Sequence, residues 1–495
     1  MSPVRYVCLS DLHLGADYSL MTLAGEGGGM DLSRPSRTLE TFGAALRRMV
    51  PLLGDGTPPT LLLMGDVLDM GLSSMVEVSS AFQRFIEVLF PRDGPQVFSD
   101  QVICIPGNHD HHLWVRAQDR HFVERLARVA PGAAAEDMIE ATSLFDPEPL
   151  PSPLLTTLMA AYPHLSAAQV RIAYPNLGLA SADGRRCILL HHGHYLDATY
   201  RAMSTLNGKL TGNDALPATV AQIEAENGSW VDFLFSDLGS SGELGRDAAT
   251  LYEISRDAGA SHWFCEKVGD ALLGGLGHAI GVGGSTKLPM GVTIENVVRG
   301  MVDATLGRAA ETGRDSYATV MSTSATADLR WYLGGPLREE LRRAGRLDTV
   351  AELSFIFGHT HKPFQDQLPV AGYPTPVGIY NTGGWVMDQP TMAAAQGASA
   401  IFIDEALNVA TLRLFNDPVD GADTQVSVRG VGGFRDLDNP LLAALSTRLA
   451  ETQPLWKEFS AAAKEAIEMH ARTLLREFFD ADGGDDRNPL ARVTA

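Results

Sequence analysis

Five short segments rich in histidine and aspartate recur along the chain, and nine of its fourteen histidines lie in or directly beside them. They are residues 11–13 (DLH), 65–69 (GDVLD), 107–110 (GNHD), 191–194 (HHGH) and 358–361 (GHTH). Imidazole and carboxylate groups together suit Mn, Fe, Zn, Ni or Co, whereas Ca and Mg prefer ligand sets made of oxygen alone. The five segments therefore predict a transition-metal site.

Each segment follows an apolar, β-forming run, such as residues 4–9 and 60–64. The first three of these runs alternate with helical patterns at residues 37–50, 76–89 and 114–129. Strands that alternate with helices imply an α/β fold with a largely parallel sheet. The end of a strand projects its next few side chains into a crevice where those of neighbouring strands converge, so we expect the metal site there.

The order and content of the five segments resemble the calcineurin-like metallophosphoesterase superfamily, whose pattern is D-x-H, G-D-x-x-D, G-N-H-D/E, H-G and G-H-x-H. All five boxes are intact, and the resemblance covers residues 1–194 and 351–415. It implies a four-layer αββα sandwich that holds two divalent metal ions, Mn foremost, with Fe, Zn, Ni or Co as alternatives. It also implies hydrolysis of a phosphomonoester, phosphodiester or pyrophosphate bond by a metal-bound hydroxide, because two cations lower the pKa of bound water.

The resemblance also assigns metal ligands to this sequence. One ion takes Asp11, His13, Asp66 and His361, and the other takes Asp66, Asn108, His192 and His359. Asp66 bridges the two ions, since a carboxylate offers two oxygens. His192 rather than His191 precedes the glycine of the H-G box, so the His191 side chain is expected on the opposite face of its strand. His359 and His361, two residues apart, would share one face if their strand continued through them.

The remaining site residues follow from the same resemblance. His109 is expected beside the leaving group, as a proton donor or a stabiliser of phosphoryl charge, with Asp110 orienting its ring. The residues expected to contact the substrate are Asn108, His194 and His112. A solvated position at the start of a helix is the alternative for His112, and Asp69 either supports the site or caps the segment that follows it.

The DLHL and GHTHKP stretches are similar to those of UDP-2,3-diacylglucosamine hydrolases. Those enzymes typically carry Arg at the position of His109, giving GNRD, whereas this chain has GNHD. The chain therefore departs from that branch. Its substrate is expected to be phosphorylated, and both a small molecule and a lipid-linked compound stay open.

The bulk composition weighs against other classes of function. A formal net charge of −21 over 495 residues argues against broad nucleic-acid binding, which needs a basic surface, and so disfavours a nuclease. A non-catalytic scaffold that binds proteins is the second alternative, but every ligand position and His109 are present. Three of the four cysteines lie in predicted strands and are expected to be buried free thiols. With no secretory signal and no apolar run of about 18 residues, we expect a cytoplasmic protein, with peripheral membrane contact left open.

The chain divides by pattern into a core, an insertion and a C-terminal part. The predicted units are the core at 1–194 and 351–430, a mainly helical, cap-like insertion at 195–350, helices at 431–482 and an acidic, disordered tail at 483–495. The apolar stretch at 271–290 is interpreted as a packed subdomain, with an acyl pocket or membrane contact as alternatives. The C-terminal helices are expected to pack on the core, with dimerisation as the alternative, and the oligomeric state stays open. A turn at 182–185 predicts a hairpin between strands at 170–174 and 187–190.

Overall fold

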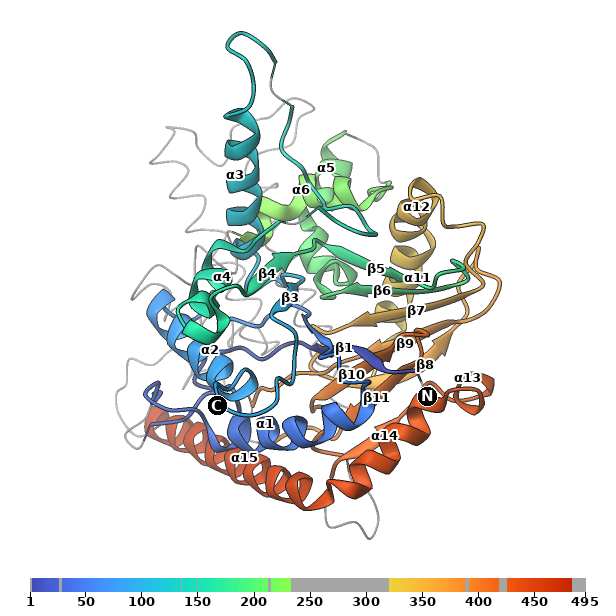
Figure 1. The fold of residues 1–495 in the computed structure, drawn as a ribbon. Helices are drawn as coiled ribbons and strands as arrows, with labels where there is room; N and C mark the ends of the chain where they lie inside the picture. The colour runs from blue at the N-terminus through green and yellow to red at the C-terminus, as the bar shows by residue number, and fades with distance from the viewer. Residues whose placement is uncertain are drawn as a thin grey trace.

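Two β-sheets packed face to face form the centre of the molecule, with helices on both outer sides (Figure 1). The structure is a computed structural model. It describes residues 2–25, 29–134, 136–148, 150–211, 215–232, 320–387, 391–417 and 425–482.

The first sheet has seven strands in the order β12-β11-β10-β1-β2-β3-β4. Their bounds are β1 (Val4–Leu9), β2 (Thr60–Leu63), β3 (Gln101–Cys104), β4 (Gln169–Ile172), β10 (Ser399–Asp404), β11 (Val409–Arg413) and β12 (Ser427–Arg429). Strands β1 to β4 run parallel, and β10 pairs antiparallel with β1. The carboxyl ends of β1, β2 and β3 therefore meet at one edge.

The second sheet has five strands in the order β5-β6-β7-β9-β8. They are β5 (Asn176–Ala180), β6 (Arg186–His191), β7 (Glu352–Phe357), β8 (Phe364–Leu368) and β9 (Val377–Asn381). Strands β6, β7 and β9 are parallel, so the carboxyl ends of β6 and β7 also lie side by side.

The predicted hairpin between residues 170–174 and 187–190 is wrong, because residues 170–174 are not the partner of the strand at 187–190. β4 pairs with β3 in the first sheet, and β6 pairs instead with β5, across the turn at residues 181–185. The chain thus crosses from one sheet to the other just before β5. Both runs are apolar, and an apolar β-forming pattern specifies a strand without specifying its partner.

Alternating side chains from both sheets fill the space between them. Cys8, Leu62 and Ile105 come from the first sheet, and Ile188 and Ile356 come from the second. This alternation follows from the period of two along a strand, which sends successive side chains to opposite faces. The predicted burial of the three strand cysteines is confirmed.

Helices cover the outer face of the first sheet. They are α1 (Arg37–Met49), α2 (Met75–Leu89), α3 (His112–Leu126), α4 (Pro153–Ala160), α14 (Pro440–Glu451) and α15 (Gln453–Asp482), with the short 3₁₀ helices η1 (Val50–Leu53) and η2 (Pro163–Leu165). The one-turn helix α13 (Phe434–Leu437) lies instead beside the second sheet, where Arg435 donates to the carbonyls of Leu353 and Pro376. Ser74 and Glu77 form a capping box that fixes the start of α2. Trp456 and Phe459 of α15 pack around Phe42 of α1, so the C-terminal helices lie against the core.

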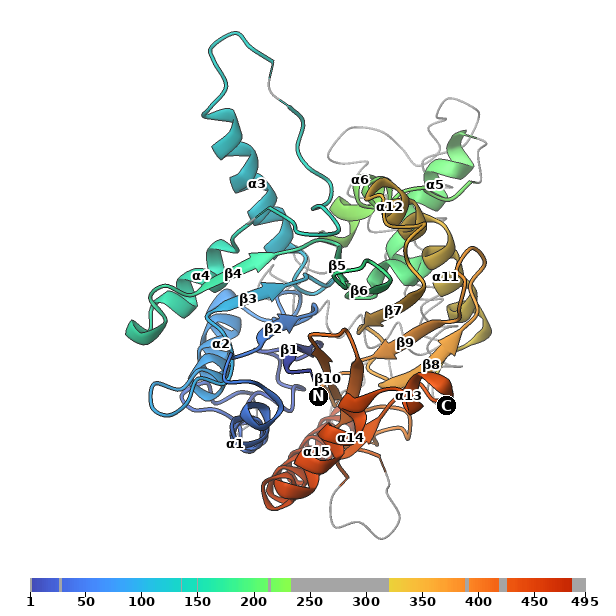
Figure 2. The same cartoon turned by 45° about the vertical axis from the view of Figure 1, so that its right-hand side comes forward.

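The described parts of the insertion lie on the side of the second sheet. They are η3 (His194–Leu196), η4 (Ala198–Arg201), α5 (Ala202–Thr211), α6 (Val220–Asp232), α11 (Thr323–Gly334) and α12 (Pro336–Arg343). Tyr332 of α11 packs on Phe355 of β7, with ring centroids 6.2 Å apart. Figure 2 shows α1 and α2 outside the first sheet and α11 and α12 outside the second. The predicted helix–sheet–sheet–helix sandwich is confirmed.

Two of the predicted regions lie outside the described residues. They are most of the insertion, including the apolar stretch at 271–290, and the tail at 483–495. Within the parts of the chain that are described, none of the helices combines the length and the apolar character needed to cross a bilayer.

Candidate metal centre

The five histidine- and aspartate-rich segments follow the carboxyl ends of β1, β2, β3, β6 and β7. The loops after β1 and β2 are bonded to each other, because the amides of Asp11 and His13 donate to the carbonyls of Gly65 and Asp66, each at 2.9 Å. The loop after β7 joins them, since the amide of His359 donates to Asp11 Oδ1 at 2.9 Å. Backbone contacts thus bring segments from both sheets to one place.

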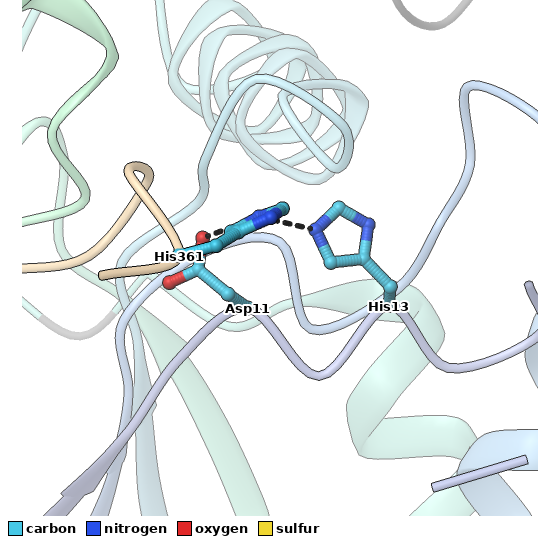
Figure 3. Close-up of side chains that lie close together, drawn as sticks. All are labelled: Asp11, His13 and His361. Carbon is cyan, nitrogen blue, oxygen red and sulfur yellow. Dashed lines mark hydrogen bonds and ion pairs between the residues drawn. The ribbon is translucent and has the colours of Figure 1, made fainter. Parts of the chain in front are cut away.

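Asp11, His13 and His361 form the first cluster (Figure 3). His13 Nε2 lies 3.3 Å from His361 Nε2, which lies 3.5 Å from Asp11 Oδ1. The other ring nitrogen of His13, Nδ1, lies 3.0 Å from Asp69 Oδ2. A carboxylate only accepts, so Nδ1 carries the proton and Nε2 presents its lone pair to the cluster. Histidines that bind metals are commonly held in this way.

Asp66, His192 and His359 form the second cluster. His192 Nδ1 donates to the carbonyl of Met64 at 3.0 Å, which leaves Nε2 facing Asp66 Oδ2 at 3.2 Å and Asn108 Oδ1 at 3.1 Å. Burial of the His192 ring opposes its charge, but the Asp66 carboxylate outweighs burial and raises the pKa of His192 to about 9. These converging lone pairs require a positive charge between them, either a proton or a metal cation. The proton and the cation compete for Nε2 of His192.

Asp66 lies between the two clusters. Its Oδ2 is 3.2 Å from His192 Nε2 and 3.8 Å from His13 Nε2. Its Oδ1 accepts the amide of His109 at 2.8 Å. Burial favours the protonated acid, but the surrounding histidines, His192 foremost, hold the pKa of Asp66 well below its usual range. The seven predicted ligands thus converge as a nitrogen-and-oxygen donor set that fits two transition-metal ions around one shared carboxylate.

Five of these residues have a left-handed backbone. Positive φ angles occur at Asp11 (51°), His13 (46°), Asp66 (49°), His359 (68°) and His361 (55°). β1 and β7 end before these residues, so the expectation of continued strands through the last histidine pair is wrong. Their side chains are aimed by tight loops, in a backbone region that is uncommon outside glycine and that concentrates at functional sites.

Glycines allow the loops to approach closely. A Cβ atom at Gly358 would overlap Asp11 Oδ2, and one at Gly65, where φ is +83°, would overlap the His192 ring. Both positions therefore need a residue without a side chain.

Comparison with known families agrees with this geometry. A family model described as calcineurin-like phosphoesterase matches residues 4–234, a range that includes four of the five segments. Residues 4–234 belong to the calcineurin-like metallophosphoesterase superfamily. No curated protein matches the chain. The family match and the histidine–aspartate clusters together support a metal-dependent phosphoesterase in general terms.

His109 of this metallophosphoesterase lies beside the first cluster, with its ring centroid 4.8 Å from that of His13. Its Nδ1 is 3.1 Å from Asp69 Oδ1. Burial opposes protonation, but the carboxylates of Asp69 and Asp66 prevail and raise the pKa of His109 to about 9. The ring is therefore charged at neutral pH and able to donate a proton.

Asp110 does not make the contact to the His109 ring that we expected. Its carboxylate accepts the amides of Gly107 at 2.6 Å, Val67 at 2.9 Å and Asp66 at 3.2 Å. Asp110 thus ties the loop after β3 to the loop after β2, and Asp69 orients His109. Both expectations for Asp69 are met by its side chain, which supports His13 and His109 and also accepts the amide of Leu72 in the segment that follows.

The three predicted substrate contacts differ in their surroundings. Asn108 lies in the second cluster. His194 is fully buried, with Nε2 3.3 Å from the Tyr174 hydroxyl, and its ring centroid is 5.6 Å from that of His192. His112 begins α3 and its Nδ1 lies 3.2 Å from Asp232 of the insertion. The His191 ring points away from the clusters, to Tyr332.

Among the described residues, sequence reasoning missed Glu224 of α6, an acidic residue near the site that contacts the residues after the GNHD segment. No motif surrounds it. The one available signal is its position on the apolar face of α6, among Val220, Ile223, Asn227 and Val231. A carboxylate on such a face must find hydrogen-bond donors in the interior.

Proposed function

We propose that the protein hydrolyses a phosphomonoester, phosphodiester or pyrophosphate bond with the help of two divalent metal ions, Mn foremost. One observation carries the proposal: two clusters of histidine and carboxylate groups share Asp66, and the His109 ring lies directly beside them. When bound, a pair of such cations lowers the pKa of a water molecule and neutralises charge on the phosphoryl oxygens.

Each residue then has a definite task. The first ion would be held by Asp11, His13 and His361, and the second by Asn108, His192 and His359, with Asp66 between them. His109 donates a proton to the leaving oxygen, since its ring is charged at neutral pH. Asp69 keeps the Nδ1 protons of His109 and His13 facing itself, so that the Nε2 atoms face the reaction.

The insertion supplies part of the wall around this site. The Tyr200 ring packs edge-on against the His359 ring, with centroids 5.1 Å apart. Asp232 reaches His112, three residues after His109. These contacts support an insertion that shapes the substrate side, and with it a substrate that extends beyond the phosphoryl group, either a bulky small molecule or a lipid-linked compound.

The test is hydrolysis of p-nitrophenyl phosphate and bis-p-nitrophenyl phosphate by chelator-stripped protein resupplied with Mn²⁺. Activity should return with the metal and be lost in Asp66→Ala. In His109→Ala, hydrolysis of phenyl phosphate, whose leaving group needs a proton, should be lost to a greater extent than hydrolysis of the p-nitrophenyl esters, while His121→Ala, a matched change on α3, should behave as wild type. The preferred ester identifies the bond class. Protein that binds two ions and hydrolyses neither ester would overturn the proposal.

A further inference from the structure

Glu224 of α6 is a buried carboxylate with hydrogen-bond donors at both oxygens, and it is only 5% exposed. Oε1 lies 3.2 Å from His111 Nε2 and 3.1 Å from the indole Nε1 of Trp114. Oε2 accepts the hydroxyl of Tyr174 at 2.9 Å and that of Tyr195. Three donors from the core and one from the start of the insertion thus meet one acidic side chain of α6.

Three of these donors come from the two loops that carry the proposed chemistry, and the fourth, Tyr174, lies between β4 and β5. His111 is two residues after His109, and Trp114 lies in the first turn of α3, which continues the same loop. Tyr195 is three residues after His192, in the loop that follows β6. The Glu224 side chain therefore ties the loop of the proposed proton donor to the loop of a proposed metal ligand.

A second acidic residue of α6 strengthens the link. Asp232 Oδ1 lies 3.6 Å from His111 Nδ1, so the His111 ring has a carboxylate at each nitrogen. Burial lowers the pKa of His111, but Glu224 and Asp232 overcome it and raise the pKa to about 9. The ring is thus positively charged between two carboxylates. Removing one partner of a buried ion pair leaves an uncompensated charge and is strongly unfavourable.

The opposite end of the same loop is held independently. Asp110 fixes residue 107 to the loop after β2, and the amide of His109 donates to Asp66. His109 therefore lies between an anchor within the core and an anchor that the insertion provides. Loss of the second anchor frees the loop on the side of α3, where a displacement of about 1 Å is enough to cost on the order of 100-fold in rate.

We propose that Glu224 is a positioning residue that aims His109 at the leaving oxygen by holding His111 and Trp114 against Tyr174 and Tyr195. The proposal rests on the function proposed above. It makes the insertion a structural part of the active site, which acts on the proton-transfer step through His109.

The test compares phenyl phosphate, whose leaving group needs a proton, with p-nitrophenyl phosphate, whose leaving group departs readily without one. In Glu224→Ala, kcat for phenyl phosphate should fall about 100-fold, within the range that general acid catalysis contributes. The kcat for p-nitrophenyl phosphate should fall less than about tenfold, and Mn²⁺ affinity should stay near the wild-type value. Glu224→Gln should recover part of the loss, because its carbonyl can accept from His111 and Trp114 while the tyrosine hydroxyls reverse and accept from its amide.

Glu226→Ala and Glu226→Gln are the matched controls, since Glu226 lies on the same helix and bonds to Gln222 at the surface; both should match the wild type on both esters. An equal loss on the two esters, or no loss, would overturn the role of Glu224. If Glu224→Ala does not fold, the ratio of the two rates in Glu224→Gln decides: a rise of about threefold supports the proposal and an unchanged ratio overturns it. A wild-type protein that binds Mn²⁺ and hydrolyses neither ester would instead overturn the proposed function.

Discussion

Replacing Asp69 by Asn tests how the site fixes which ring nitrogen of His13 and His109 carries the proton. Oδ1 of Asp69 faces His109 Nδ1 at 3.1 Å and accepts the amide of Leu72 at 3.0 Å. Oδ2 faces His13 Nδ1 at 3.0 Å and accepts the Tyr18 hydroxyl. Burial raises the pKa of Asp69, but His109 and His13 more than compensate and hold it well below its usual value. All four neighbours are donors to an ionised acceptor.

An Asn side chain has an oxygen that accepts and an NH₂ group that only donates. In Asp69→Asn, the NH₂ group must therefore face two hydrogen-bond donors. A backbone amide cannot reverse, whereas the Tyr18 hydroxyl can, and the Asn nitrogen is therefore expected on the side of Tyr18 and His13. His13 must then accept at Nδ1 and carry its proton at Nε2, the atom that faces the metal cluster. Loss of such a supporting contact costs about 10–100-fold in metal affinity, which corresponds to about 1.4–2.8 kcal/mol.

Competition with a chromogenic chelator for Mn²⁺ measures this loss directly, and kcat at saturating Mn²⁺ shows what remains of catalysis. Asp17→Asn is the matched control, because Asp17 lies in the neighbouring loop with an exposed side chain. It should change metal affinity less than twofold. Metal affinity in Asp69→Asn within twofold of wild type would refute the reasoning about the proton on His13.

Three further predictions concern close packing, the C-terminal helices and pH. Gly358→Ala should abolish Mn²⁺ binding in a calorimetric titration, because its methyl group overlaps Asp11 Oδ2; retained affinity would show that the loop has room. Trp456→Ala should lower the free energy of unfolding in urea by about 3–5 kcal/mol, since the indole is fully buried, whereas a loss under 1 kcal/mol would mean that α15 packs loosely. Burial lowers the pKa of His470 to about 4, below its unfolded value of about 6.5, so stability is present above pH 6.5 and is lost as the pH falls towards 4. Between pH 7 and pH 5 the wild type should lose about 2 kcal/mol more than His470→Leu in urea titrations, and equal losses would contradict this.

Residue type and spacing indicated a metal site, and the resemblance to the metallophosphoesterases assigned its proposed ligands. Acidic and imidazole groups at the ends of predicted strands have few other uses, and the structure gathers all seven of them into two clusters. Their backbone was not predictable, because the positive φ angles at Asp11 and His359 belong to loops that have no strand periodicity. The roles of these residues in binding metal stay predictions until a titration is made.

Contacts between distant segments account for most of what the sequence did not reveal. Asp110 is adjacent to His109 in the chain, yet the carboxylate that reaches the ring is that of Asp69, 40 residues away. Glu224 is 113 residues from His111. Contacts between residues this far apart in the chain leave no local pattern in the sequence. The partner of β6 was missed for a related reason, because strand periodicity carries no information on which strands become neighbours.

The pairing of β1 has a consequence for how the protein emerges from the ribosome. β1 is made long before β10, which is one of its two neighbours, and the side chains of Arg5 and Glu405 that meet beside this pair are 400 residues apart in the chain. Until β10 is synthesised, one edge of β1 has unpaired amides and carbonyls, the kind of edge that pairs with other chains. Large proteins expose such edges in partly folded intermediates. The nascent chain is therefore expected to depend on chaperones until β10 has been translated, and to load metal only after residues 359 and 361 have been made.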